Sequence, residues 1–268
     1  MKKKITFIGV GNLTQSLLYG FNTISHRNNI NLYDIDSKKK KFANKTNITF
    51  TGDLHIAVKN ADLIIIAVKP KNYRSVCISL NKIDLSNTTI ISLMAGVRVK
   101  ELSTHLNDYS NVSRVMTNIN AKYLQALSFV YFGSKVSSKS KSLIKDIFNC
   151  FGEVQILKSE SSMDKVTALV GSGPAYFIHF AEEMSNIFSK LGFSKKESTN
   201  YMKQVFYGTA LLCNKDSRSL KKIKESIASK GGTTESALKV LNRERFNVIL
   251  DKTIHAAYKK SQTLSKDK

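Results

Sequence analysis

Two glycines and two threonines stand directly before an amphipathic helical pattern in the stretch SKGGTTESALKVL, residues 229–241. One interpretation is local: Thr234 is the N-cap of the helix, and Gly231 and Gly232 form an ordinary loop. The other interpretation is a binding site, because backbone N–H groups and hydroxyls at a helix N-terminus can hold a small anion. Other motifs along the chain decide between the two.

A second glycine-rich turn lies near the beginning of the chain, in ITFIGVGNLTQSLLYGF. Gly9 and Gly11 follow a predicted strand and precede a predicted helix, which is the context of a dinucleotide-binding fingerprint. The first glycine permits the tight turn, and the second lets the backbone approach a pyrophosphate at the helix N-terminus. Asn12 can add a side-chain contact, and Thr14 stands where a third Gly or Ala serves packing. The pattern predicts a dinucleotide site.

Asp34 ends the second predicted strand, about 20 residues after the fingerprint, where an acid accepts hydrogen bonds from the adenosine ribose. A carboxylate there repels a 2′-phosphate, which favours NADH. Ser37 and the four lysines at 38–41 follow closely and can hold a 2′-phosphate, so NADPH is the alternative. A turn-capping acid at a strand end is a further interpretation of Asp34.

The chain has only two prolines. Pro70 follows a predicted buried strand in IIIAVKP, where a doubly wound sheet presents residues to its ligand. Pro174, in ALVGSGPAYFIHFAEEM, interrupts a helical pattern, and a proline there removes a backbone hydrogen bond and kinks the helix. Each proline either contributes to a binding site or only ends or interrupts a secondary-structure element.

The elements that must position these residues alternate between strands and helices in the first half of the chain. Continuous β-branched runs such as LIIIAV, residues 63–68, fit strands buried on both faces of a parallel sheet. This alternation predicts an α/β fold with a Rossmann-like doubly wound sheet. The predicted strands are residues 4–9, 30–34, 63–68, 89–93, 112–116, 128–132 and 153–157, and the predicted helices are 13–21, 37–43, 54–59 and 73–80.

From about residue 163 apolar residues recur at helical spacing, and no alternating strand pattern appears. This predicts an all-helical C-terminal domain. We place the dinucleotide-binding domain at residues 1–160 and the helical domain at 161–268. The predicted helices of the second domain are residues 175–191, 199–212, 223–227, 237–241 and 246–258.

The net charge of +22 is the strongest compositional feature of this chain of 268 residues. It suggests nucleic-acid binding, but the basic residues are mostly lysines scattered along the chain, and the longest cluster, residues 38–41, has no interleaved aromatics or arginines. We therefore predict no nucleic-acid partner. The sequence contains no run of about 18 apolar residues, so we predict no membrane span. Cys77, Cys150 and Cys213 lack metal-ligand spacing, which indicates buried thiols in a reducing cytoplasm and no metal site.

Taken together and in order, six motifs resemble the pyrroline-5-carboxylate reductase family nearly from end to end. They are GxGN, AVKP, AGV, FGE, GSGPAY and GGTT followed by ESALKVL, at residues 9–12, 67–70, 95–97, 151–153, 171–176 and 231–241. GSGPAY and GGTT are the most specific of them.

The resemblance implies reduction of 1-pyrroline-5-carboxylate to L-proline, the last step of proline biosynthesis, by hydride transfer from NADH or NADPH to the imine carbon. It implies a Rossmann domain and a helical dimerisation domain whose helices interleave with those of a partner subunit. The active site would then lie at the subunit interface of a homodimer. Five dimers, forming a decamer, also occur in the family.

The resemblance also implies the site residues. Those that cradle the pyrophosphate would be Gly9, Gly11, Asn12 and Leu13. Those against the nicotinamide would be Ala67, Lys69, Pro70, Ala95, Gly96 and Asn118. Those around the substrate would be Ser172, Ser229, Gly232, Thr233 and Thr234, with Thr234 and Ser229 as the catalytic residues.

This resemblance answers the question about residues 229–241. The substrate is a cyclic imine with one carboxylate, which suits free N–H groups and the Ser229 hydroxyl at a helix N-terminus. Thr234 can hydrogen-bond the ring nitrogen. A protonated imine is already a good electrophile, so positioning would provide most of the rate.

One motif departs from the family. Its MPNTPA loop is here MTNINA, residues 116–121, where Asn118 matches but both prolines and the threonine are replaced. Ala126 occupies a position where the family has a glycine, and Lys230 occupies one where the family typically has a proline. A non-catalytic or altered-specificity relative that binds dinucleotide is therefore an alternative, although retention of GSGPAY and GGTT argues against it. Another imine or hydroxyacid reductase on the same fold is the second alternative. The catalytic lysine of the β-hydroxyacid dehydrogenases is missing from GSGPAYFIHFAEEM.

Overall fold

The computed structural model describes residues 3–23 and 29–264. Its contacts divide the chain into two compact units, Met1–Pro174 with Ala257–Lys268, and Ala175–Ala256. The first unit extends beyond residue 160 because Met163 and Val166 are buried against Met116. The domain ranges 1–160 and 161–268 stay predictions from the sequence.

The first unit contains one sheet, which has eight strands within the described residues, in the order β3-β2-β1-β4-β5-β6-β7-β8. Neighbouring strands are parallel except β6 and β7, which are antiparallel. The order reverses between β1 and β4, which is the point where doubly wound sheets bind ligands. The strands are β1 (Lys4–Ile8), β2 (Asn29–Tyr33), β3 (Thr49–Thr51), β4 (Leu63–Ile66), β5 (Thr89–Ser92), β6 (Val112–Met116), β7 (Ala126–Phe132) and β8 (Gly152–Ile156).

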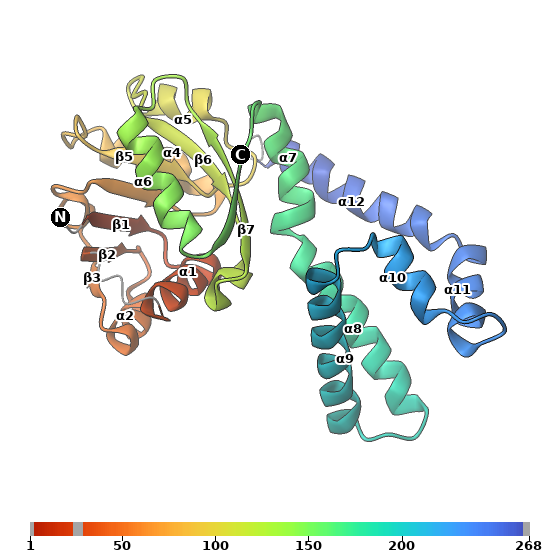
Figure 1. Cartoon of the computed structure of the whole chain (residues 1–268). Helices are drawn as coiled ribbons and strands as arrows, with labels where there is room; N and C mark the ends of the chain where they lie inside the picture. Colours follow the sequence, from red (N-terminus) through yellow and green to blue (C-terminus); the bar gives the residue numbers. More distant parts are fainter. Residues whose placement is uncertain (1–2, 24–28, 265–268) are drawn as a thin grey trace. The chain divides into compact units, whose positions relative to one another are not determined.

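Helices cover both faces of this sheet (Figure 1). Side chains of successive strand residues point to opposite faces. Leu63 and Ile65 of β4 therefore join the cluster under α1 and α6, whereas Ile64 and Ile66 join the cluster under α3, α4 and α5. These helices are α1 (Asn12–Thr23), α2 (Lys40–Thr46), α3 (Leu54–Val58), α4 (Tyr73–Leu80), α5 (Val99–His105) and α6 (Ser138–Asn149). The predicted Rossmann-like doubly wound sheet is confirmed.

The segment leading to Pro174 is irregular. After α7 (Met163–Val166), residues Thr167–Gly171 form a π-helical turn, in which the Ser172 N–H donates to the Thr167 carbonyl at 3.1 Å. Pro174 is the second residue of α8 (Gly173–Lys190), where its missing N–H is tolerated because the first turn of a helix has no intrahelical acceptors for its N–H groups. The interruption predicted at Pro174 therefore takes the form of a π turn.

The second unit is helical throughout, as predicted. A capping box begins α9: the Glu197 N–H donates to Ser194 Oγ, and Glu197 Oε2 accepts the Ser194 N–H. Besides the rest of α8, the helices are α9 (Lys195–Lys215), α10 (Leu220–Ile227), α11 (Thr233–Arg243) and α12 (Phe246–Thr263), the end of which belongs to the first unit. None of the helices in the described part of the chain is long and apolar enough to cross a membrane.

Apolar side chains of the second unit are mostly exposed in the single chain. Buried side chains within residues 175–256 are limited to Ser185, Ser198, Met202 and Ile223. Exposed ones include Phe177, Phe180, Phe206, Tyr207, Leu220 and Ile249. So many exposed large apolar side chains within one unit indicate an association surface, because monomers rarely leave extensive apolar surface uncovered.

Candidate functional site

The turn between β1 and α1 is fixed by the conformation of Gly9. Its φ is +98°, and a Cβ there would lie 2.7 Å from the Ala67 carbonyl oxygen. The Gly9 N–H donates to the Tyr33 carbonyl at 2.8 Å, and the Gly9 carbonyl accepts the Thr14 hydroxyl at 2.8 Å. Thr14 is fully buried, so the residue that replaces the third glycine of the fingerprint braces the turn.

The backbone beyond this turn is open. A Cβ on Gly11 would meet no protein atom within 4 Å, so packing does not require glycine at this position. Gly11 and Asn12 are exposed at the start of α1, and Leu13 packs partly against the core. The residues fit a pyrophosphate, because an accessible helix N-terminus preceded by bare backbone is the usual seat for one.

Asp34 links the end of β2 to the glycine turn. Its Oδ2 accepts the Val10 N–H at 2.7 Å, and its Oδ1 accepts the Asp36 N–H at 2.9 Å. The carboxylate is thereby held at the sheet edge with lone pairs remaining on both oxygens. Asp34 thus braces the turn and also faces a pocket.

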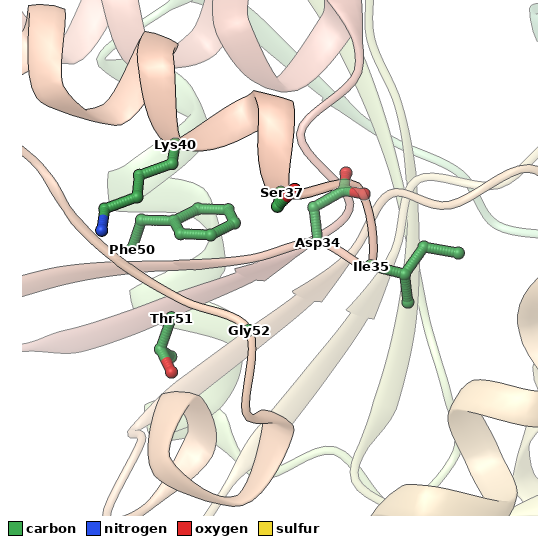
Figure 2. A pocket seen from close by; sticks show the side chains of 7 residues that line it. All are labelled: Asp34, Ile35, Ser37, Lys40, Phe50, Thr51 and Gly52. Carbon is green, nitrogen blue, oxygen red and sulfur yellow. The ribbon is translucent and has the colours of Figure 1, made fainter.

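That pocket has a volume of about 370 Å³ and lies beyond the ends of β2 and β3 (Figure 2). In Figure 2 the ring of Phe50 lies between Lys40 and Asp34. The lining residues are Asp34, Ile35, Ser37, Lys40, Phe50, Thr51 and Gly52. Its place next to the fingerprint suits the adenosine end of a dinucleotide. Phe50, Thr51 and Gly52 could not be predicted from the sequence, because β3 has three residues and no apolar run.

The segments after β4 and β5 form the neighbouring part of the same sheet edge. Pro70 begins a short 3-10 turn after the exposed Lys69, and Gly96 has a φ of +77°. The Tyr73 hydroxyl donates to Glu101 Oε1 at 2.7 Å, which ties these segments together. Burial and the Glu101 carboxylate raise the pKa of Tyr73. The structure therefore brings Ala67, Lys69, Pro70, Ala95 and Gly96 to the edge where doubly wound sheets bind ligands.

Residues 116–121 form an ordered turn without the family prolines. The Ser128 hydroxyl donates to Thr117 Oγ1 at 2.9 Å, and both side chains are buried. Residues Ile119–Tyr123 form a 3-10 turn against α1, where a Cβ on Gly20 would overlap the Ala121 carbonyl oxygen. The Lys122 ammonium lies 5.2 Å from the ring centre of Tyr19 on α1. The altered loop thus packs on α1, the helix that follows the glycine turn.

The buried Arg114 of β6 forms an ion pair with Glu160. It is 2% exposed, and its Nη1 lies 2.9 Å from Glu160 Oε1, which also accepts the Val99 N–H at 2.7 Å. Among the described residues, Arg114 Nε and Nη2 have no hydrogen-bond partner. The pair therefore connects β6 to the start of α5.

In the second unit, Gly232 is the N-cap of α11 and Thr234 is the second residue of the helix. The interpretation of Thr234 as N-cap is therefore wrong, because the chain enters the helix two residues earlier. Within the described residues no side chain caps this helix. The N–H groups of its first turn, which include Thr233 and Thr234, point out of the helix and lack intrahelical acceptors.

The loop before α11 is shaped by its glycines. Gly231 has a φ of +76°, and a Cβ on Gly232 would lie 2.6 Å from Ser229 Oγ. Gly231 also donates its N–H to Glu235 Oε2 at 2.8 Å. This N–H and the Lys239 ammonium hold the pKa of the Glu235 carboxyl below its ordinary value. The Ser229 hydroxyl thus lies beside an uncapped helix N-terminus, an arrangement that can receive a carboxylate.

The predicted residues fall into two groups. All predicted cofactor residues, together with Ser172, belong to the first unit, and Ser229, Gly232, Thr233 and Thr234 belong to the second. Ser172 donates its hydroxyl to the Thr167 carbonyl at 3.3 Å. A doubly wound sheet with a glycine-rich fingerprint after its first strand is typical of oxidoreductases that use a nicotinamide dinucleotide.

Comparison with known proteins identifies the family. The model for pyrroline-5-carboxylate reductase dimerisation matches residues 160–264, and the model for NADP oxidoreductase, coenzyme F420-dependent, matches residues 4–96. Pyrroline-5-carboxylate reductase from Staphylococcus epidermidis is 28% identical over 269 residues, 98% of each chain. The chain belongs to the pyrroline-5-carboxylate reductase family.

Solved structures agree with this assignment. A pyrroline-5-carboxylate reductase from Coxiella burnetii has a TM-score of 0.87 and 29% identity, covering 99% of each chain. The enzyme from Plasmodium falciparum, solved with NADP bound, has a TM-score of 0.87 and 26% identity, covering 98% of each chain. The dimerisation match accounts for the exposed apolar surface of the second unit, which supports oligomerisation.

Proposed function

We propose that this protein reduces 1-pyrroline-5-carboxylate to L-proline, the last step of proline biosynthesis. The observation that carries the proposal is the uncapped N-terminus of α11, with Ser229 beside it, in a chain of this family. A protein that only bound dinucleotide would not need a second anion seat.

In the proposed mechanism the substrate carboxylate accepts hydrogen bonds from the first-turn N–H groups of α11 and from the Ser229 hydroxyl. Gly232 lets the backbone come close to that carboxylate, and Thr233 contributes a first-turn N–H. The Thr234 hydroxyl hydrogen-bonds the ring nitrogen and orients the imine. Ser172 is a further substrate-binding residue. The bound dinucleotide supplies the hydride. Because a protonated imine is already electrophilic, orientation by these residues accounts for most of the rate.

The test is the oxidation of NADH and of NADPH by the purified protein with 1-pyrroline-5-carboxylate, followed by absorbance of the reduced nicotinamide. Turnover that yields proline supports the proposal. A folded protein that binds dinucleotide and yields no proline with either cofactor would refute it and favour the non-catalytic alternative.

For the cofactor we propose a preference for NADH. The Asp34 carboxylate is fixed by the Val10 and Asp36 N–H groups and faces the pocket, where it would accept ribose hydroxyls and repel a 2′-phosphate. Ser37 and Lys40 line the same pocket and would favour NADPH, the cofactor form bound in the Plasmodium falciparum relative. The charge of Asp34 is therefore the deciding feature.

Asp34→Asn should raise the ratio of kcat/KM for NADPH over NADH by about tenfold, since removing one charge near a phosphate changes binding by about 1.4 kcal/mol or more. Asparagine keeps an acceptor for the Val10 N–H and loses only the bond to the Asp36 N–H, which is exposed and can bind water instead. Steady-state kinetics and cofactor Kd with both dinucleotides measure the effect. Asp36→Asn, a change at an exposed carboxylate that caps Lys38 at 3.0 Å, is the matched control. An unchanged ratio in Asp34→Asn would refute the role of this carboxylate.

We also propose a homodimer formed through the second unit, with five dimers in a decamer as the larger assembly. Sedimentation velocity distinguishes the two.

A cytoplasmic location is in keeping with Cys77, Cys150 and Cys213, which are all free thiols. Cell fractionation tests that location.

A further inference from the structure

Asn118 is almost completely buried, with 7% of its surface exposed, and both ends of its amide are engaged. Its Oδ1 accepts the Asn120 N–H at 3.1 Å and caps the 3-10 turn Ile119–Tyr123. Its Nδ2 donates to the Val170 carbonyl at 3.3 Å. The side chain therefore joins the altered loop, residues 116–121, to the π turn Thr167–Gly171.

The Val170 carbonyl lacks its ordinary helical partner. In an α-helix this carbonyl would accept the N–H of residue 174, four positions later. Residue 174 is Pro174, which has no N–H. A carbonyl without a donor is costly where water reaches it poorly, and Val170 is half-buried, so Asn118 Nδ2 supplies the hydrogen bond that the proline cannot.

The same two segments touch at a second point. Met116 is the last residue of β6. A Cβ added to Gly171 would lie 3.1 Å from the Met116 Sδ. Met116 is buried with Met163 and Val166 of α7. The π turn therefore lies against Met116 at the end of β6 and is hydrogen-bonded to Asn118, two residues further along the chain.

We propose that Asn118 is a positioning residue that replaces the missing N–H of Pro174 and thereby holds Ser172 at a fixed place relative to residues 116–121. Ser172 follows the π turn directly, and its N–H and hydroxyl both donate to the Thr167 carbonyl, at 3.1 Å and 3.3 Å. Losing the Asn118 bond frees Val170 and loosens the turn that presents Ser172. The effect on turnover rests on the proposed reductase function, whereas the effect on the π turn does not.

Asn118→Asp is the sharpest test. The carboxylate keeps an acceptor for the Asn120 N–H but turns an oxygen toward the Val170 carbonyl, so the anchor is lost and replaced by repulsion. Hydrogen–deuterium exchange of the Ser172 amide should become about tenfold faster. The kcat/KM for the imine should fall about tenfold, while the dinucleotide Kd stays within about twofold of the wild-type value. Asn120→Asp makes the same change at an exposed position of the same loop and should alter none of these values.

Unchanged exchange of the Ser172 amide in Asn118→Asp would overturn the proposal. A raised dinucleotide Kd with unchanged exchange would overturn it as well and assign Asn118 to the cofactor, as the family resemblance implies. If Asn118→Asp does not fold, Asn118→Ala replaces it, since it removes the Nδ2 donor to the Val170 carbonyl without adding a charge and should speed the same exchange. Unchanged exchange in Asn118→Ala would again overturn the proposal. A wild-type protein without turnover refutes the reductase function and leaves the exchange test intact.

Discussion

Gly9→Ala will destabilise the protein and abolish dinucleotide binding, whereas Gly11→Ala will lose dinucleotide affinity at unchanged stability. At Gly9 the added Cβ would lie 2.7 Å from the Ala67 carbonyl oxygen, on a backbone with φ of +98°. The strained φ alone costs roughly 1–3 kcal/mol, before the overlap is relieved. At Gly11 the Cβ meets no protein atom within 4 Å, so only the ligand would meet it.

Thermal melting and titration with NADH, followed by nicotinamide fluorescence, measure both effects. We expect a Tm for Gly11→Ala equal to that of the wild type and a Kd raised by at least about tenfold, or 1.4 kcal/mol. Wild-type affinity in Gly11→Ala would show that the pyrophosphate does not approach this backbone. Equal loss of stability in both variants would contradict the difference between the two glycines.

Thr234→Ala will lower kcat/KM for the imine on the order of a hundredfold, because in the proposed mechanism the hydroxyl orients the ring nitrogen at the moment of hydride transfer. The dinucleotide Kd should not change, since the predicted cofactor residues all belong to the other unit. Steady-state kinetics at saturating cofactor measure the loss.

The matched control for Thr234→Ala is Ser236→Ala. It removes a hydroxyl two residues further along the same helix, one that donates to the Gly232 carbonyl at 3.2 Å. The control should retain wild-type kinetics. An equal loss in both variants would indicate damage to the helix start, and full activity in Thr234→Ala would exclude a role for its hydroxyl.

Much of the first unit follows from local patterns. The run LIII of β4 is apolar because its residues alternate between two buried faces, and such continuous runs predict a parallel sheet from the sequence alone. Gly9 and Gly11 could be predicted because the turn and the pyrophosphate place backbone requirements on single positions. Short elements without an apolar run were not predictable, and β3 with its pocket residue Phe50 is the clearest case.

The side-chain connections could not be predicted, because they join residues far apart in the sequence. Asn118 was predicted as a cofactor residue from the motif, but its bond to Val170 depends on a π turn that no periodicity indicates. The start of α11 could not be predicted either, because the sequence alone does not decide whether Gly232 or Thr234 is its N-cap. The cofactor and substrate roles of the motif residues stay predictions that the variants above test.

The most direct measurement uses NADH that carries deuterium at both C4 positions of the nicotinamide ring. Mass spectrometry of the proline formed from 1-pyrroline-5-carboxylate then shows whether deuterium is transferred to the product. Proline carrying one deuterium at the former imine carbon is the result that the reductase account predicts. Proline without deuterium, or no proline from a protein that binds the cofactor, would contradict it.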